Sequence, residues 1–139
     1  MSCLIDSSVW SLSLRRKPSD LNSEQRSIVD ELAALIREDR ANLIGLVRQE
    51  ILSGIRHQAQ FERLRSLLRT FRDVVLDSAD YESAARASNQ CTSKGITISV
   101  VDALICAVAL RRDWTIFTTD SDFERFARIL SIKLHEPRK

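Results

Sequence analysis

Residues 115–126 of the chain read TIFTTDSDFERF. The run Thr115–Thr118 is short, apolar and β-branched, which predicts a buried strand. It stops before Asp120 and Asp122, and Phe123 and Phe126 then recur at a spacing that predicts a helix. Two carboxylates at the end of a buried strand indicate either a cap for that helix or part of a metal site.

The same order of a short apolar run and an amphipathic helix recurs along the chain. Strands are predicted at 2–5, 42–44, 74–76, 115–118 and 132–134, and helices at 7–15, 23–39, 46–55, 61–71, 78–93, 99–112 and 120–129. This alternation predicts an α/β fold with a mostly parallel sheet and helices on both faces. Functional groups in such sheets collect beyond the carboxyl ends of the strands, where Asp6 and Asp120 both stand.

The totals predict one soluble domain over residues 1–139. Hydrophobic residues make up 44% and charged residues 29% of the chain, as in ordinary globular proteins. No apolar run reaches the ~18 residues of a membrane span, and the N-terminus lacks the basic start of a secretory signal. Three widely spaced cysteines indicate reduced thiols and a cytoplasmic protein. His57 and His135 are isolated and no C-x-x-C occurs, which argues against zinc.

The net charge of +2 is less informative than its distribution. Basic residues cluster at Arg15, Arg16 and Lys17, again over 56–72, and at 111–112. If five of the 19 acidic residues shared one pocket, 21 basic groups would face 14 acidic ones (19 − 5) on the remaining surface. A solvated surface is the simpler interpretation, and a polyanionic partner is the sharper one.

Four carboxylates are candidates for a site, although each has a simpler explanation. Asp6 and Asp120 are placed to cap the helices that follow them, and Glu50 is an ordinary solvated helix residue. Gly54, four residues beyond Glu50, is costly inside a helix and suggests a close approach there. Asp102 is the one charged residue between 95 and 110, although Ser99-x-x-Asp102 fits a capping box.

Together the four carboxylates favour a metal site, because the topology brings strand ends and helix N-termini to one edge. Several carboxylates cannot remain charged at close range without compensation. Mg²⁺ prefers oxygen ligands, keeps several waters and suits phosphodiester hydrolysis. We therefore expect a hard divalent cation such as Mg²⁺ at this edge.

Four ordered segments resemble the PIN-domain ribonucleases, and among them the VapC-type toxins of bacterial toxin–antitoxin pairs. They are LIDSSVW at 4–10, EILSG at 50–54, VDALI at 101–105 and TTDSDF at 118–123. The resemblance spans essentially the whole chain. It implies a three-layer α/β/α sandwich with a short, mostly parallel sheet. It also implies cleavage of single-stranded regions of RNA, a homodimer, and a small antitoxin that wraps the toxin.

The resemblance also assigns roles to residues. Asp6, Asp102 and Asp120 hold the ion, which the resemblance implies is Mg²⁺ or Mn²⁺, and Glu50 is a ligand or helps to deprotonate the attacking water. Asp122 is a helper or a water-mediated ligand of the ion. Ser7, where the family more often has Thr, and Thr118 are hydroxyls that support the acidic cluster. The basic clusters, Arg15, Arg16 and Lys17 among them, hold the RNA backbone.

Two other classes of function stay open from the residues alone. A catalytically silent fold of this type, acting through a partner protein, would bind no metal. A phosphotransfer domain of the receiver or phosphatase type would carry paired acidic residues after the first strand, where Asp6 instead stands alone before Ser7.

Overall fold

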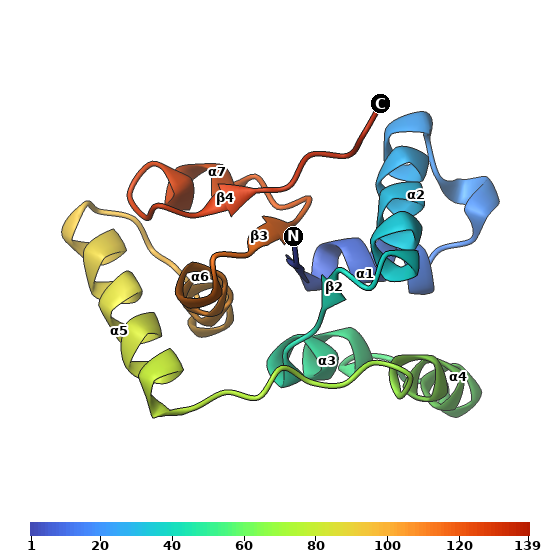
Figure 1. Ribbon diagram of the computed structural model, residues 1–139. Helices are drawn as coiled ribbons and strands as arrows, with labels where there is room; N and C mark the ends of the chain where they lie inside the picture. The colour runs from blue at the N-terminus through green and yellow to red at the C-terminus, as the bar shows by residue number, and fades with distance from the viewer.

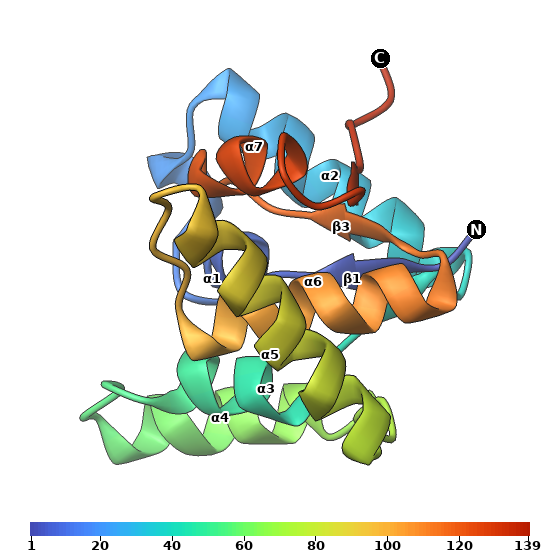
Figure 2. The same ribbon diagram turned by 90° about the vertical axis from the view of Figure 1, so that its left-hand side faces the viewer.

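A four-stranded parallel sheet lies at the centre of the computed structural model, which describes residues 1–139. β1 (Cys3–Ile5) pairs with β2 (Ala41–Asn42) on one side and with β3 (Thr115–Phe117) on the other. β4 (Lys133–Leu134) joins the outer edge of β3, so the order is β2-β1-β3-β4. Because β1 and β3 run in the same direction, their carboxyl ends open at one edge of the molecule (Figure 2).

Helices cover both faces of this sheet, as the sequence predicts (Figure 1). α6 (Val100–Arg112) packs on β1 and β3, and α5 (Ser78–Ser93) packs along its outer side. α2 (Ser23–Arg37) lies across the sheet from them. The remaining elements are α1 (Ser7–Leu14), a 3-10 turn at Pro18–Asp20, α3 (Gly45–Leu52), α4 (Gln58–Leu68) and α7 (Asp122–Ala127).

Burial explains why α6 is apolar on nearly every side. Residues 103–109 are all buried, because the sheet covers one side of the helix and α5 the other. They belong to a core cluster of 28 buried residues that also holds the whole of β1. A helix that is hydrophobic on nearly every side must be enclosed in this way, and Asp102 lies in its first turn.

A buried ion-pair network joins α5 to α6. The carboxylate of Asp80 is fully buried and accepts hydrogen bonds from the guanidinium groups of Arg111 and Arg112, at 2.7 and 2.8 Å. Hydrogen bonding from Arg112 is the main cause that holds the pKa of Asp80 well below its usual range. Asp77 caps α5 through a reciprocal hydrogen-bonded box with Asp80.

Three predictions need correction. No strand forms at 74–76: Val75 is 87% exposed, and the one bridge nearby joins Leu43 to Asp73, just before this segment. The helix predicted at 46–55 runs from Gly45 to Leu52. Gly54 therefore lies beyond it, at φ +83°, and a Cβ there would meet nothing within 4 Å. The residue serves a left-handed turn and marks no close approach.

No helix of the chain is both long and apolar enough to cross a membrane. All three cysteines are buried free thiols, as predicted from their spacing. Burial raises the pKa of Cys3 to about 11 and raises that of Cys106 as well. These thiols therefore stay protonated and act as small apolar core residues.

Candidate active site

The carboxylate of Asp6 is the best-fixed group at the carboxyl edge of the sheet. The residue directly follows β1 and is only 5% exposed. Its Oδ2 accepts a hydrogen bond from the hydroxyl of Ser8 and another from the hydroxyl of Thr118, each at 2.8 Å. Although Asp6 occupies the N-cap position of α1, its side chain makes no cap bond. The simple capping explanation therefore fails for this residue.

The same two hydroxyls hold the end of β3. Ser8 Oγ accepts the backbone N–H of Thr119 at 3.0 Å, and Thr118 Oγ1 accepts the backbone N–H of Asp120 at 3.0 Å. The Asp120 carboxylate in turn accepts the backbone N–H of Asp122 at 2.9 Å. Ser8 and Thr118 thus tie Asp6 to the segment that carries Asp120, and Asp6 and Thr118 are 112 residues apart in sequence. This arrangement is called the hydroxyl clamp below.

Asp102 joins the group from the first turn of α6. Ser99 is the N-cap, and its hydroxyl accepts the backbone N–H of Asp102 at 3.0 Å. The return bond of a capping box, from the backbone N–H of Ser99 to the carboxylate of Asp102, is not made. Burial first, and then the charges of Asp6 and Asp120, raise the pKa of Asp102 to about 6, with a smaller contribution from Glu50. The four carboxylates therefore share one electrostatic environment.

Glu50 approaches from α3 and, like Asp120, is exposed, whereas Asp6 is buried and Asp102 is half-buried. It lines a hollow with Ser7 on α1 and Val101 on α6, the neighbours in sequence of Asp6 and Asp102. Its carboxylate makes no hydrogen bond or ion pair within the chain. This acid is consequently free to turn toward the other three or toward a bound molecule.

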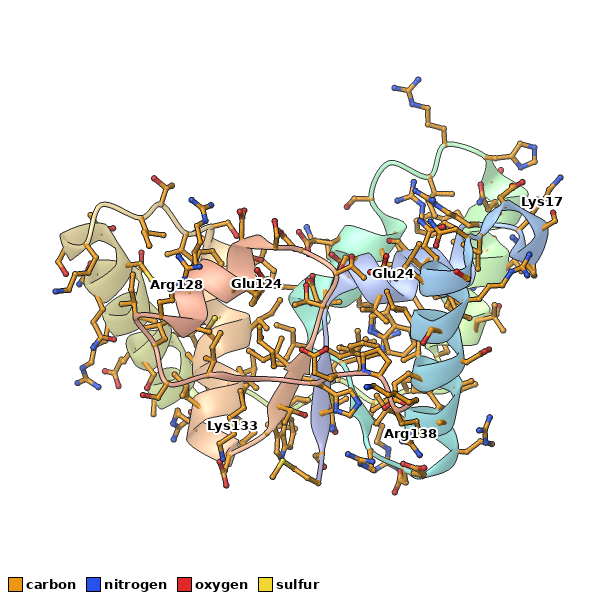
Figure 3. All side chains as sticks on the ribbon, turned by 90° about the horizontal axis from the view of Figure 1, so that it is seen from above. Lys17, Glu24, Glu124, Arg128, Lys133 and Arg138 are labelled. Carbon is orange, nitrogen blue, oxygen red and sulfur yellow. The ribbon has the colours of Figure 1, made fainter.

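Other candidate residues lie in less central positions. The hydroxyl on Asp6 belongs to Ser8, and the role expected of Ser7 is therefore wrong. A pair of adjacent serines carries no signal that distinguishes them, because the backbone of the first helical turn decides which one faces the strand. The Asp122 carboxylate oxygen Oδ1 lies 2.6 Å from Nη2 of Arg125 in an ion pair. The negative charge of Asp122 is thus held beside the four carboxylates. Arg15 borders the hollow of Glu50, whereas Lys17 lies at the far end of this face, beyond Glu24 (Figure 3).

Comparison with known proteins agrees with this geometry. A family model described as the PIN domain matches residues 3–129. The chain belongs to the PIN-domain family. It is 31% identical over 132 residues to ribonuclease VapC11 of Mycobacterium tuberculosis, covering 94% of this chain and 95% of that protein.

Solved structures share the fold of this PIN domain. The FitAcB structure from Neisseria gonorrhoeae superposes with a TM-score of 0.76 at 23% identity, over 97% of both chains. A toxin–antitoxin complex from Klebsiella pneumoniae gives 0.68 at 18% identity, over 99% of both chains. At these identities the likeness establishes the α/β architecture with helices on both faces of the parallel sheet.

The donor set of this PIN domain fits a hard divalent cation. Its four central side chains offer only carboxylate oxygens, the ligands that Mg²⁺ and Mn²⁺ prefer. No group of three acidic, His or Cys side chains closes into a ready-made coordination shell. Carboxylates repel one another and therefore stay apart when no cation is bound. A partly hydrated ion takes few direct protein ligands, so carboxylates spaced in this way can still hold it.

A second hollow lies on the other side of Asp120. It has a volume of about 280 Å³, and its wall includes Thr118, Thr119 and Glu24 together with the C-terminal segment from Leu134 to Pro137. Glu24 on α2 and Glu124 on α7 lie across from one another on this face (Figure 3). The acidic character of the edge thus extends beyond the four central carboxylates.

Proposed function

We propose that the chain is a divalent-metal-dependent endoribonuclease of the VapC type, which hydrolyses single-stranded RNA and acts as the toxin of a toxin–antitoxin pair. The observation that carries this proposal is the meeting of Asp6, Glu50, Asp102 and Asp120, from four separate segments, beside the hydroxyl clamp. Such a concentration of negative charge destabilises a fold, and it is useful where a cation must be bound. Membership of the PIN family and the similarity to ribonuclease VapC11 support the same function.

The chain's own residues divide the work. Mg²⁺ or Mn²⁺ at this edge would supply Lewis-acid chemistry and neutralise charge at the phosphate. Asp6, Asp102 and Asp120 hold the ion, and the hydroxyl clamp fixes the orientation of the Asp6 carboxylate. Glu50, free of internal partners, accepts the proton of the attacking water. Asp122, bound to Arg125, supports the helix that follows Asp120.

The proposed partner is a small antitoxin protein, and the proposed assembly is a homodimer. The toxin–antitoxin complex from Klebsiella pneumoniae contains a chain of this fold. If the chain is such a toxin, its induction should arrest growth. Coexpression of its antitoxin should restore growth and yield a complex that copurifies with the chain.

The decisive test is cleavage of single-stranded RNA by the purified chain and by Asp6→Asn. We expect cleavage with Mg²⁺ or Mn²⁺ and none with excess EDTA. Asp6→Asn should lose more than roughly 100-fold of the rate, the upper end of what a merely supporting residue contributes. Asp20→Asn is the matched control, because Asp20 is exposed and its carboxylate has no partner.

A parent chain that is inert toward RNA with either metal, and shows no thermal shift with Mn²⁺, would overturn the proposal. That outcome would favour a silent interaction module instead. Cleavage by Asp6→Asn at the parent rate, with contaminating nucleases excluded, would overturn the assignment of the site.

A further inference from the structure

We propose that the hollow between α1, α3 and the start of α6 binds one unstacked RNA nucleotide next to the bond that is cut. This inference rests on the proposed ribonuclease function and adds the site where the substrate is held. The lining residues are Ser7, Ser11, Arg15, Leu46, Gln49, Glu50, Ser53 and Val101. The hollow is here called the α1–α3 pocket.

The α1–α3 pocket overlaps the group of four carboxylates at one residue, Glu50. Two other pocket residues are sequence neighbours of that group, since Ser7 follows Asp6 and Val101 precedes Asp102. A phosphate at the carboxylates would therefore have its neighbouring nucleotide within reach of this pocket. The pocket measures about 410 Å³, within the range of small-molecule sites.

Three polar side chains of this pocket, each reached by solvent, have no partner within the chain. The side chains of Ser7, Ser11 and Gln49 make no hydrogen bond within the chain, whereas the neighbouring Ser8 is fully engaged in the hydroxyl clamp. Hydroxyl and amide groups of this kind suit the sugar and the edge of a base. They offer both donors and acceptors, which a simple anion site would not need.

Arg15 supplies the one positive charge in the pocket. None of the ion pairs of the structure involves its guanidinium group. It is the C-cap residue of α1, at the end of this helix away from its N-cap residue Asp6. A free guanidinium forms strong paired hydrogen bonds with a phosphate. Arg15 is therefore suited to bind the next phosphate of the RNA. The four carboxylates would repel that phosphate.

The apolar part of the lining implies a single-stranded substrate. Leu46 on α3 and Val101 on α6 are the two hydrophobic residues of the pocket, and they offer surface to the face of a base. A base within a duplex cannot leave its stack without a cost of a few kcal/mol. Only an unpaired nucleotide would place its base there cheaply.

The experiment compares Arg15→Gln with the matched control Arg37→Gln on a single-stranded RNA that the parent chain cleaves. Arg37 is exposed, lacks an ion pair and lies at the end of α2, where the chain turns back toward the start of β1. Arg15→Gln should raise KM roughly tenfold, the value of one charge-assisted hydrogen bond, with kcat largely retained. The slope of log KM against log salt should fall by about 1 for this variant only.

A second arm tests the base itself. Each nucleotide around the cut is replaced in turn by an abasic ribose, and kcat/KM is measured for the parent and for Gln49→Ala. At one position, the abasic ribose should lower kcat/KM of the parent. On that abasic substrate, the parent and Gln49→Ala should have the same kcat/KM.

An Arg15→Gln variant whose KM and salt slope match those of Arg37→Gln, in a parent that cleaves RNA, would overturn the pocket alone. The pocket would also be overturned if kcat/KM of the parent were the same whichever nucleotide is replaced by an abasic ribose. A parent that cleaves no RNA would overturn the proposed function instead.

Discussion

Replacing Asp102 by Asn should stabilise the fold while it abolishes activity. Burial and the neighbouring carboxylates raise the pKa of Asp102 from 3.8 to about 6. This displacement corresponds to about 3 kcal/mol of penalty on the ionised form. Because Asp102 keeps some contact with solvent, we expect screening to leave about 1–2 kcal/mol. For a chain of this size, such a gain raises Tm by roughly 3 to 8 °C.

The pH dependence gives the sign of the effect. An acid with a raised pKa holds its proton more tightly in the folded state, so its contribution to stability is lost as pH rises from about 4 to about 6. The Tm of Asp102→Asn should exceed that of the parent above pH 6, and the two Tm values should approach each other near pH 4. Added Mg²⁺ should raise the Tm of the parent, as a ligand of the folded state does, and raise that of the variant less.

Thermal unfolding in metal-free buffer, with Asp20→Asn as the control for loss of one negative charge, provides the measurement. An Asp102→Asn variant that melts at or below the control at pH 7.5 would refute the reasoning. The carboxylates would then not be repelling one another. Loss of RNA cleavage together with a higher Tm is the combination that a general folding defect cannot produce.

Three further predictions concern the framework of the site. Thr118→Val removes a hydroxyl from the clamp and should lower the rate of RNA cleavage roughly 10- to 100-fold with little change in Tm, and an unchanged rate would exclude the clamp from the mechanism. Asp80→Asn leaves two guanidinium groups without their buried partner and should cost about 3 kcal/mol in urea unfolding; because the pKa of Asp80 is lowered, that difference should shrink as pH falls below about 4. Gly54→Ala places a side chain at φ +83° and should cost about 1 kcal/mol of unfolding free energy, whereas Gly45→Ala, whose nearest atom would lie 3.5 Å away, should be nearly neutral.

Much of the site could be predicted because its carboxylates sit where two local patterns meet. Asp6 follows a buried strand, and Asp120 follows another closely, so the parallel topology alone brings them to one edge. Asp102 was recognisable as a lone charge in the apolar helix that covers the same strands. These inferences use only periodicity and burial, which the sequence records well.

What could not be predicted depends on a single residue's orientation or on packing between distant elements. Ser8 rather than Ser7 reaches Asp6, and nothing in the pair of letters separates them. The β-branched run at 74–76 has the composition of a strand, yet Val75 is exposed, and pairing with the residues after β2 is limited to the single bridge between Leu43 and Asp73. The composition of a segment indicates which secondary structure it favours. Whether the segment forms a strand also depends on how far a neighbouring strand pairs with it.

The hydroxyl clamp also sets when the site can exist. Asp6 is made 112 residues before its partner Thr118, so a growing chain holds this carboxylate without its partner while the residues between them are synthesised. β3 must reach the ribosome's exit and insert beside β1 before the carboxylates can meet. An enzyme that attacks RNA would thus remain harmless to the message and the ribosome producing it until nearly all of the domain had been translated.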